Sequence, residues 1–223
     1  MIYLSAGHAT NDPGAVSNNT TEFTVTKTIA ETLWSRNKTM IKLVPVGITL
    51  KQRIGWLNTH STSNDFLIEL HMNSGNEVAH GAEMYFRANS ESDRQLAQKY
   101  IDSYCDSSKI WNRGVHADTS TRHKRLGILR DVKPRGLLLE MGFITNLEDL
   151  ELVLKNAVNG LEAMLQLNHE PMNDRPLAEW ELTAMKFAVD TKIMKDERPL
   201  ENITRVEVAE IFRKFYLFWI NKS

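Results

Sequence analysis

The sequence predicts an α/β fold, in which a mostly parallel, twisted sheet carries helices on both faces and a small helix–loop–helix unit follows. Short apolar runs alternate with helical patterns through the first three quarters of the chain, which favours βαβ units. The runs at 66–70 and 137–139 are continuously apolar apart from Glu69. Such runs are typical of central strands that are covered on both faces.

The apolar runs predict strands near residues 1–5, 40–46, 65–71, 81–87, 126–130 and 136–140. The helical patterns predict helices near residues 22–37, 48–61, 91–110 and 146–167. The last of these helices has a defined start, because Thr145 and Glu148 have the spacing of a capping box.

The pattern breaks around residues 167–176, where two prolines with polar spacing predict a linker. We therefore divide the chain into a first domain at 1–168, a linker at 169–176 and a small helical unit at 177–223. Two helical patterns in this unit each place apolar residues on one face. Because a unit of this size rarely holds a stable core unaided, we expect it to pack on the first domain, on another copy or on a target.

Composition excludes several functional classes. The net charge of −1 shows no basic excess, so we expect no nucleic-acid partner. No segment has the roughly 20 apolar residues that a membrane span requires. Residues 1–5 lack the features of a signal peptide, so we expect synthesis in the cytoplasm and delivery of the protein by another route. The single cysteine, Cys105, excludes an intrachain disulfide and a cysteine zinc site.

Four residues that can bind metal or move protons stand where an apolar run ends or a helix begins: His8, Glu22, His71 and Glu140. Ligands bind at the carboxyl ends of parallel strands, so these side chains can converge. Two imidazoles and a carboxylate suit Zn²⁺ with an open position, and the remaining carboxylate could act as a general base. The pattern indicates a zinc hydrolase.

Each of these residues alone also has an ordinary structural explanation. His8 could lie in a loop after an edge strand, and Glu22 could simply favour the positive end of a helix. His71 and Glu140 close buried strands, so each needs a partner for its polar side chain.

Several segments together resemble the zinc-dependent N-acetylmuramoyl-L-alanine amidases of the amidase-3 type, which occur in bacterial autolysins and phage endolysins. The resemblance spans about residues 1–167. Its motifs are SAGH at 5–8, DPGA at 12–15, Glu22, LHMN at 70–73 and LEMGFITN at 139–146.

The resemblance implies that His8, Glu22 and His71 hold one Zn²⁺ and that Glu140 is the catalytic carboxylate. It also implies peptidoglycan as substrate, with hydrolysis between N-acetylmuramic acid and L-alanine. An endolysin would act at the cell wall after release through a holin-type pore. Two alternatives stay open: a zinc peptidase acting on stem peptides, and a non-catalytic wall-binding protein.

Three further residues are candidate accessory residues: Glu69, Asn73 and Arg130. Many members of the family carry a small hydroxyl residue where this chain has Glu69. A strand places Glu69 on the same face as His71, so its carboxylate could orient that imidazole or merely face a polar crevice. Arg130 could bind a peptide carboxylate or form a structural ion pair. The polar stretch 116–125 predicts a surface loop that contacts substrate or only aids solubility.

Part of the terminal unit resembles one S-layer homology repeat, chiefly in ITRVEVA at 203–209. Such repeats bind secondary cell-wall polymers, usually as a set of three. Only one copy is present, and the glycine-rich loop of the family is replaced by KDERP at 195–199. Wall targeting through 177–223 and a packing or dimerising role are therefore both open.

Overall fold

The computed structural model describes residues 1–121 and 124–166. The predicted linker and the unit at 177–223 lie outside these described residues. A six-stranded sheet in the order β4-β1-β5-β8-β6-β7 forms the centre of the described fold. Its strands are β1 (Ile2–Ala6), β4 (Ile41–Leu43), β5 (Phe66–Asn73), β6 (Ala82–Phe86), β7 (Asn112–Ala117) and β8 (Arg135–Phe143).

Four neighbouring strands, β4, β1, β5 and β8, run parallel. Strand β6 runs antiparallel to β8, and β7 runs parallel to β6. The prediction of a mostly parallel sheet is therefore confirmed, with a reversal at the β8–β6 boundary. A short hairpin, β2 (Val16–Ser17) and β3 (Thr20–Thr21), stands outside this sheet.

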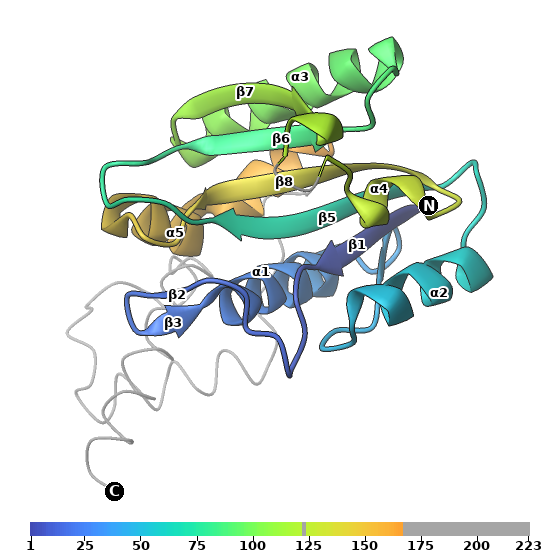
Figure 1. Ribbon diagram of the computed structural model, residues 1–223, viewed down its shortest axis with the longest axis horizontal. Coiled ribbons are helices and arrows are strands. Elements are labelled where there is room, and N and C mark those ends of the chain that lie inside the picture. The colour runs from blue at the N-terminus through green and yellow to red at the C-terminus, as the bar shows by residue number, and fades with distance from the viewer. Residues whose placement is uncertain (122–123, 167–223) are drawn as a thin grey trace, which may run out of the picture. The chain divides into compact units, whose positions relative to one another are not determined.

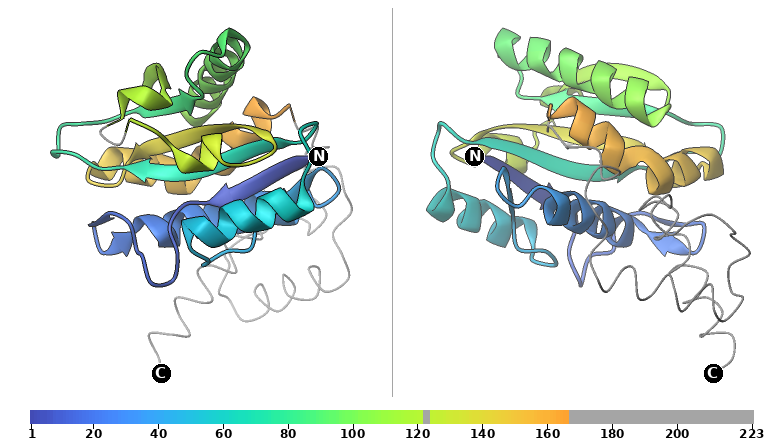
Figure 2. Two further views of the ribbon diagram at one scale, coloured as in Figure 1. Left: turned by 45° about the vertical axis from the view of Figure 1, so that its right-hand side comes forward. Right: turned by 180° about the vertical axis from the view of Figure 1, so that it is seen from behind.

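Helices cover both faces of the sheet, as the sequence predicts (Figures 1 and 2). Their bounds are α1 (Glu22–Arg36), α2 (Leu50–His60), α3 (Glu91–Ser108), α4 (Gly127–Arg130) and α5 (Leu147–Met164). Seen from behind in Figure 2, α1, α3 and α5 lie together over one face. The large hydrophobic core lies between that face and these three helices.

The opposite face carries α2 and α4 over a smaller hydrophobic cluster. Leu57 of α2 packs there with Leu67 and Leu138 from the two central strands. Side chains alternate along a strand, so this face also receives Glu69 and His71 of β5 and Glu140 of β8. Beyond the cluster the same face of the sheet is polar, and this polar region holds the candidate site.

The strand expected at 126–130 is wrong, because Gly127–Arg130 forms the short helix α4. The consecutive residues Ile128 and Leu129 of this helix are both buried, because a helical turn lets both side chains point towards the small cluster. A short apolar run cannot distinguish these two structures by its period. Strand β7 was not predicted, because its sequence NRGVHA has no apolar run and none of its residues is fully buried.

The buried carboxylate of Asp149 joins the first turn of α5 to β8 and to the residue just before β6. Its Oδ2 accepts hydrogen bonds from the backbone N–H of Gly81 at 2.7 Å and of Phe143 at 2.8 Å. Asp149→Ala leaves two buried donors unpaired, so we expect the free energy of unfolding to fall by about 2–4 kcal/mol. Urea denaturation measures this loss, with Glu148→Ala at the exposed neighbouring residue as the control. Equal stability of the two variants would contradict this account.

Candidate metal centre

The candidate site lies where the order of the strands reverses. From β1 the chain passes through α1 to β4 on one side, and β5 then joins β1 on the other side. Such a switch point opens a crevice at the carboxyl ends of the two strands. His8 follows β1 and His71 lies near the end of β5, so the topology alone brings the two imidazoles to one crevice. Their ring centroids are 5.1 Å apart.

Two glycines make the close approach of these rings possible. A Cβ on Gly7 would lie 2.6 Å from Nε2 of His71, and one on Gly14 would lie 2.6 Å from Oε2 of Glu22. Gly14 also has a φ of +68°, a conformation that a side chain disfavours. His8 itself adopts a φ of 64°, which is uncommon for a residue with a Cβ. The loop after β1 is therefore shaped around the site.

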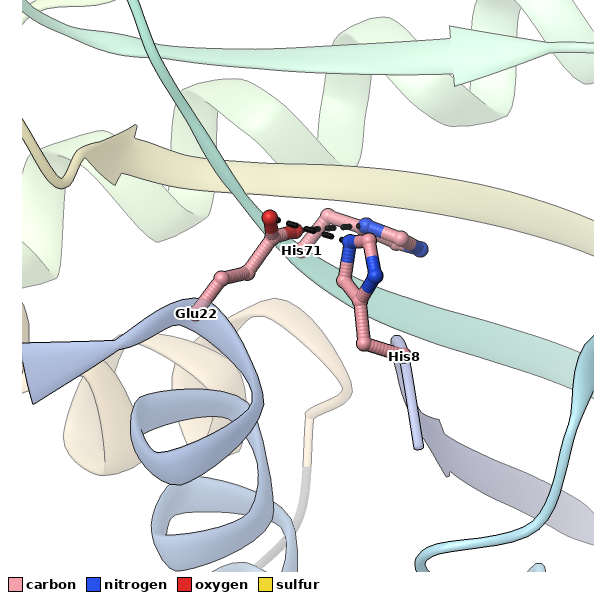
Figure 3. A group of neighbouring side chains, drawn as sticks. All are labelled: His8, Glu22 and His71. Carbon is pink, nitrogen blue, oxygen red and sulfur yellow. Dashed lines mark hydrogen bonds and ion pairs between the residues drawn. The ribbon is translucent and has the colours of Figure 1, made fainter. Parts of the chain in front are cut away.

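Glu22 joins the two histidines (Figure 3). One carboxylate oxygen lies 3.0 Å from Nε2 of His8, and the other lies 2.7 Å from Nδ1 of His71. Backbone N–H groups of Ala15 and Met72 each donate to the same carboxylate at 3.1 Å. Glu22 is the first residue of α1, whose N-cap is Thr21. The helix start thus aims an almost fully buried carboxylate at both rings.

This cluster shifts the pKa of each member. Burial opposes the charge on Glu22, but the bonds with both histidines outweigh it and hold the pKa of its carboxyl far below the usual range. Burial likewise opposes a charged His71, yet Glu22 and Glu69 raise the pKa of its imidazole to about 10. For His8, burial lowers the pKa of the imidazole and Glu22 raises it, and the net pKa is raised. The site therefore favours a positive charge between these three side chains.

A metal ion fits the donor set. One ligand atom from each of His8, Glu22 and His71 can be chosen so that all three lie within 4.8 Å of one another. Two imidazoles with one carboxylate, partly open to solvent, form a set that suits Zn²⁺ and leaves room for a further ligand. The structure therefore brings together the three residues that the sequence predicts as metal ligands.

Glu140 lies beside the cluster, directly across from His71 in the pairing of β5 with β8. Its Oε2 is buried and makes no hydrogen bond to the described residues. Burial is the main reason that the pKa of its carboxyl rises to about 7. The nearby His71 lowers this pKa, and the negative charge of Glu22 raises it further. A carboxyl with this pKa can both accept and release a proton near neutral pH.

Glu69 is completely buried behind His71, with Oε1 3.6 Å from Nε2 of that ring. Arg53 of α2 lies 3.1 Å from the same carboxylate oxygen and also donates to the backbone carbonyl of His8. Burial opposes the charge on Glu69, but Arg53 and His71 outweigh it and lower the pKa of its carboxyl. One buried arginine therefore contacts the segments that carry both histidines.

Asn73 and Arg130 each have a carboxylate partner outside the cluster. Asn73 donates from Nδ2 to Oε1 of Glu83 at 2.8 Å. Arg130 donates from Nε and Nη2 to the two carboxylate oxygens of the buried Asp118, with an Nη2–Oδ1 distance of 2.6 Å. For Arg130 this geometry matches the structural ion pair rather than a free peptide-binding group.

A cleft of about 810 Å³ contains His8, Glu22, His71 and Glu140. Ser120, Thr121 and Arg125 from the predicted loop at 116–125 also line this cleft, although 116 and 117 belong to β7. Of the described helices, none is long and apolar enough to cross a membrane.

Sequence reasoning missed two charged residues of the site, Arg53 and Glu83. Arg53 lies in the helix predicted near residues 48–61, where an arginine is usually exposed, yet it is only 4% exposed. Glu83 lies opposite Glu140 in the β6–β8 pairing and is 5% exposed. A carboxylate within the apolar strand AEMYF was the available signal, because such a group needs partners.

The buried Arg53–Glu69 pair leads to a stability prediction. Arg53→Leu leaves Glu69 buried without its cation, so we expect unfolding to become easier by about 3–5 kcal/mol. The double variant Arg53→Leu/Glu69→Leu should recover most of this loss, because no buried charge then lacks a partner. Urea denaturation in chelating buffer measures both variants without any contribution from bound metal. A double variant as unstable as the single one would show that the pair is not the cause.

Comparison with known proteins agrees with this fold. Residues 2–164 match the protein family described as N-acetylmuramoyl-L-alanine amidase. The chain is 26% identical over 158 residues to the uncharacterized protein YqiI of Bacillus subtilis, covering 67% of this chain and 73% of YqiI. It is also 26% identical over 176 residues to a probable autolysin, PH, of Staphylococcus aureus, covering 70% of this chain but 35% of that relative.

Among solved structures, the catalytic domain of the CD27L endolysin targeting Clostridia difficile has a TM-score of 0.60 at 23% identity. The match covers 76% of this chain and 98% of that domain, and it supports a common fold. The family match runs from the first residue of β1 to the last residue of α5. The protein therefore belongs to the N-acetylmuramoyl-L-alanine amidase family, whose members are peptidoglycan hydrolases.

Proposed function

We propose that this protein hydrolyses the amide bond between N-acetylmuramic acid and L-alanine of peptidoglycan, with one Zn²⁺ held by His8, Glu22 and His71. The observation that carries this proposal is the convergence of three ligand atoms beside Glu140 within one cleft. Among the described residues Glu140 has no hydrogen-bond partner at its buried Oε2, which leaves that oxygen available to a reacting water.

In this proposal each residue has a separate task. When bound, zinc supplies Lewis acidity, which activates water near neutral pH and stabilises negative charge on the amide oxygen. Glu140 accepts the proton of the attacking water and returns it to the departing nitrogen of L-alanine. The Glu69 carboxylate, 3.6 Å from Nε2 of His71, helps to keep that ring oriented, while Arg53 donates to the backbone carbonyl of His8.

We further propose a lysin role at the cell wall. The names of two relatives, a probable autolysin and an endolysin, support this role. If the protein is phage-encoded, a holin-type pore would bring it to its substrate. Targeting by 177–223 through a secondary wall polymer stays a proposal, because those residues lie outside the described part of the chain.

Analysis of the reaction products tests the proposed bond. Purified cell walls treated with zinc-loaded protein should release stem peptides that begin with a free L-alanine amino group. Chelation should stop this release, and added zinc should restore it, because the Lewis acid is needed for the reaction. Mass spectrometry identifies the products. Cleavage inside the stem peptide would instead favour the zinc peptidase, and wall binding without any product would favour a non-catalytic binder.

The role of Glu140 is tested by Glu140→Gln. Removal of the proton acceptor should lower kcat by about 10²–10⁴-fold, the usual contribution of a general base. Zinc content measured by mass spectrometry should stay at one ion per chain, because the three ligands are intact. Glu151→Gln, at an exposed position of α5, is the matched control. Normal lysis by the Glu140 variant would rule out the proposed proton transfer.

A further inference from the structure

The sheet face next to the metal cleft continues over β6 and β7 as a polar surface. The hydrophobic cluster under α2 and α4 ends at the partly buried Tyr85 of β6. Beyond it the same face presents Glu83, Arg113 and His116. These side chains line a hollow of about 590 Å³, which shares Tyr85 and Ser120 with the metal cleft. The two spaces are therefore adjacent parts of one recessed surface.

We propose that Arg113 and His116 form a binding subsite for a carboxylate of the stem peptide. This inference rests on the proposed amidase function and adds to it the chemical group that the enzyme recognises beyond the scissile bond. It concerns the peptide side of the substrate and assigns recognition to β7, a strand with no residue in the metal centre.

Arg113 is held in a fixed orientation by three contacts. Its Nε donates to Oε2 of Glu83 at 2.9 Å, and its Nη1 donates to the carbonyl of His80 at 3.1 Å. The guanidinium carbon also lies 5.0 Å from the centroid of the Phe143 ring. An arginine held in this way loses little conformational entropy when it binds a ligand.

The same arginine keeps donor groups for a ligand. Its Nη2 makes no hydrogen bond to another described residue, and the side chain is 38% exposed. The buried carboxylate of Glu83 has hydrogen-bond donors besides Arg113. Asn73 and the hydroxyl of Tyr85 donate to its other oxygen at 2.8 Å and 2.9 Å. A guanidinium edge has only donors and suits an anionic group, which in a stem peptide is a carboxylate.

His116 adds a second polar group on the same side. Its ring lies 5.7 Å from the ring of Tyr85, and 39% of the side chain is exposed. Its Nε2 is 3.6 Å from the Glu83 carboxylate that also holds Arg113. The imidazole and the guanidinium therefore gather around one buried anchor and both reach solvent.

The distance from the reacting bond limits which carboxylate can bind. Glu83 pairs directly with Glu140, and antiparallel partners have Cα atoms about 4.5–5.5 Å apart. Arg113 lies one strand further away, on β7. The Arg113 guanidinium nevertheless lies at Glu83, one strand spacing from Glu140. An extended peptide spans at most about 3.3–3.6 Å per residue, so the second stem residue is the first that can cross this spacing. The expected ligand is thus the free α-carboxylate of a D-glutamate at that position.

The test uses uncross-linked peptidoglycan strands in two forms, with either D-glutamate or its α-carboxamide at the second stem position. For the zinc-loaded full chain we expect kcat/KM to be about tenfold or more higher for the carboxylate form. Arg113→Gln should bring this ratio close to one, mainly by raising KM for the carboxylate form. The carboxamide form serves as an internal reference for any general loss of activity or folding.

Two further variants separate recognition from structure. Arg113→Lys keeps a cation beside Glu83 but loses the planar fork, so we expect an intermediate ratio. Arg87→Gln, which removes an exposed arginine just after β6, should leave the ratio of the wild-type protein unchanged.

An equal kcat/KM for both forms in the wild-type protein, or an unchanged ratio in Arg113→Gln, would overturn the subsite and leave the amidase function intact. Failure of the wild-type protein to cleave either form at the lactyl–alanine bond would instead refute the proposed function, and the subsite with it.

Discussion

The contacts of the Glu22 carboxylate join three segments that are distant in the sequence: the loop after β1, the start of α1 and the end of β5. Both histidines and two backbone N–H groups converge on this one side chain. A buried carboxylate is costly unless such partners surround it, so the surrounding loop must adopt one conformation. The glycines at 7 and 14 and the left-handed backbone of His8 follow from that requirement. The strand order produces the crevice, and the contacts of Glu22 fix the positions of the two histidine rings inside it.

Charge is compensated pair by pair around this cluster. Glu69 is balanced by Arg53, Glu83 by Arg113 and Asp118 by Arg130. Each of these carboxylates is buried and each arginine comes from a different structural element, so the ion pairs fasten α2, β7 and α4 around the site. Glu140 is the exception, because no arginine pairs with it among the described residues. Its carboxyl pKa of about 7 lets it accept a proton and release it again near neutral pH, as proton transfer in catalysis requires.

The reversal at the β8–β6 boundary gives the site its open side. Helices α2 and α4 cover the face over the central parallel strands, whereas the polar side chains of β6 and β7 continue that face beyond the small hydrophobic cluster. A polymer substrate needs such a surface, because the parts on either side of the bond must leave the cleft. The polar composition of β7, which made the strand hard to predict, is explained by this position.

The sequence by itself determined that the sheet is mostly parallel and that helices cover both of its faces. It also identified the four candidate site residues at strand ends and at a helix start. The spacing of apolar residues indicates which side chains are buried, and proline and capping residues mark where elements end or begin. These signals lie within each segment, so they can be read without the tertiary structure. The structure alone decided that α4 replaces a strand and that β7 exists. It also decided that Arg53 is buried against the segments of the two histidines and Glu83 beside Glu140. A polar residue does not reveal its partners in sequence. Partners such as Arg53 and Glu69 meet only when the sheet is assembled, because strand pairing and helix packing set distances between residues that are remote along the chain.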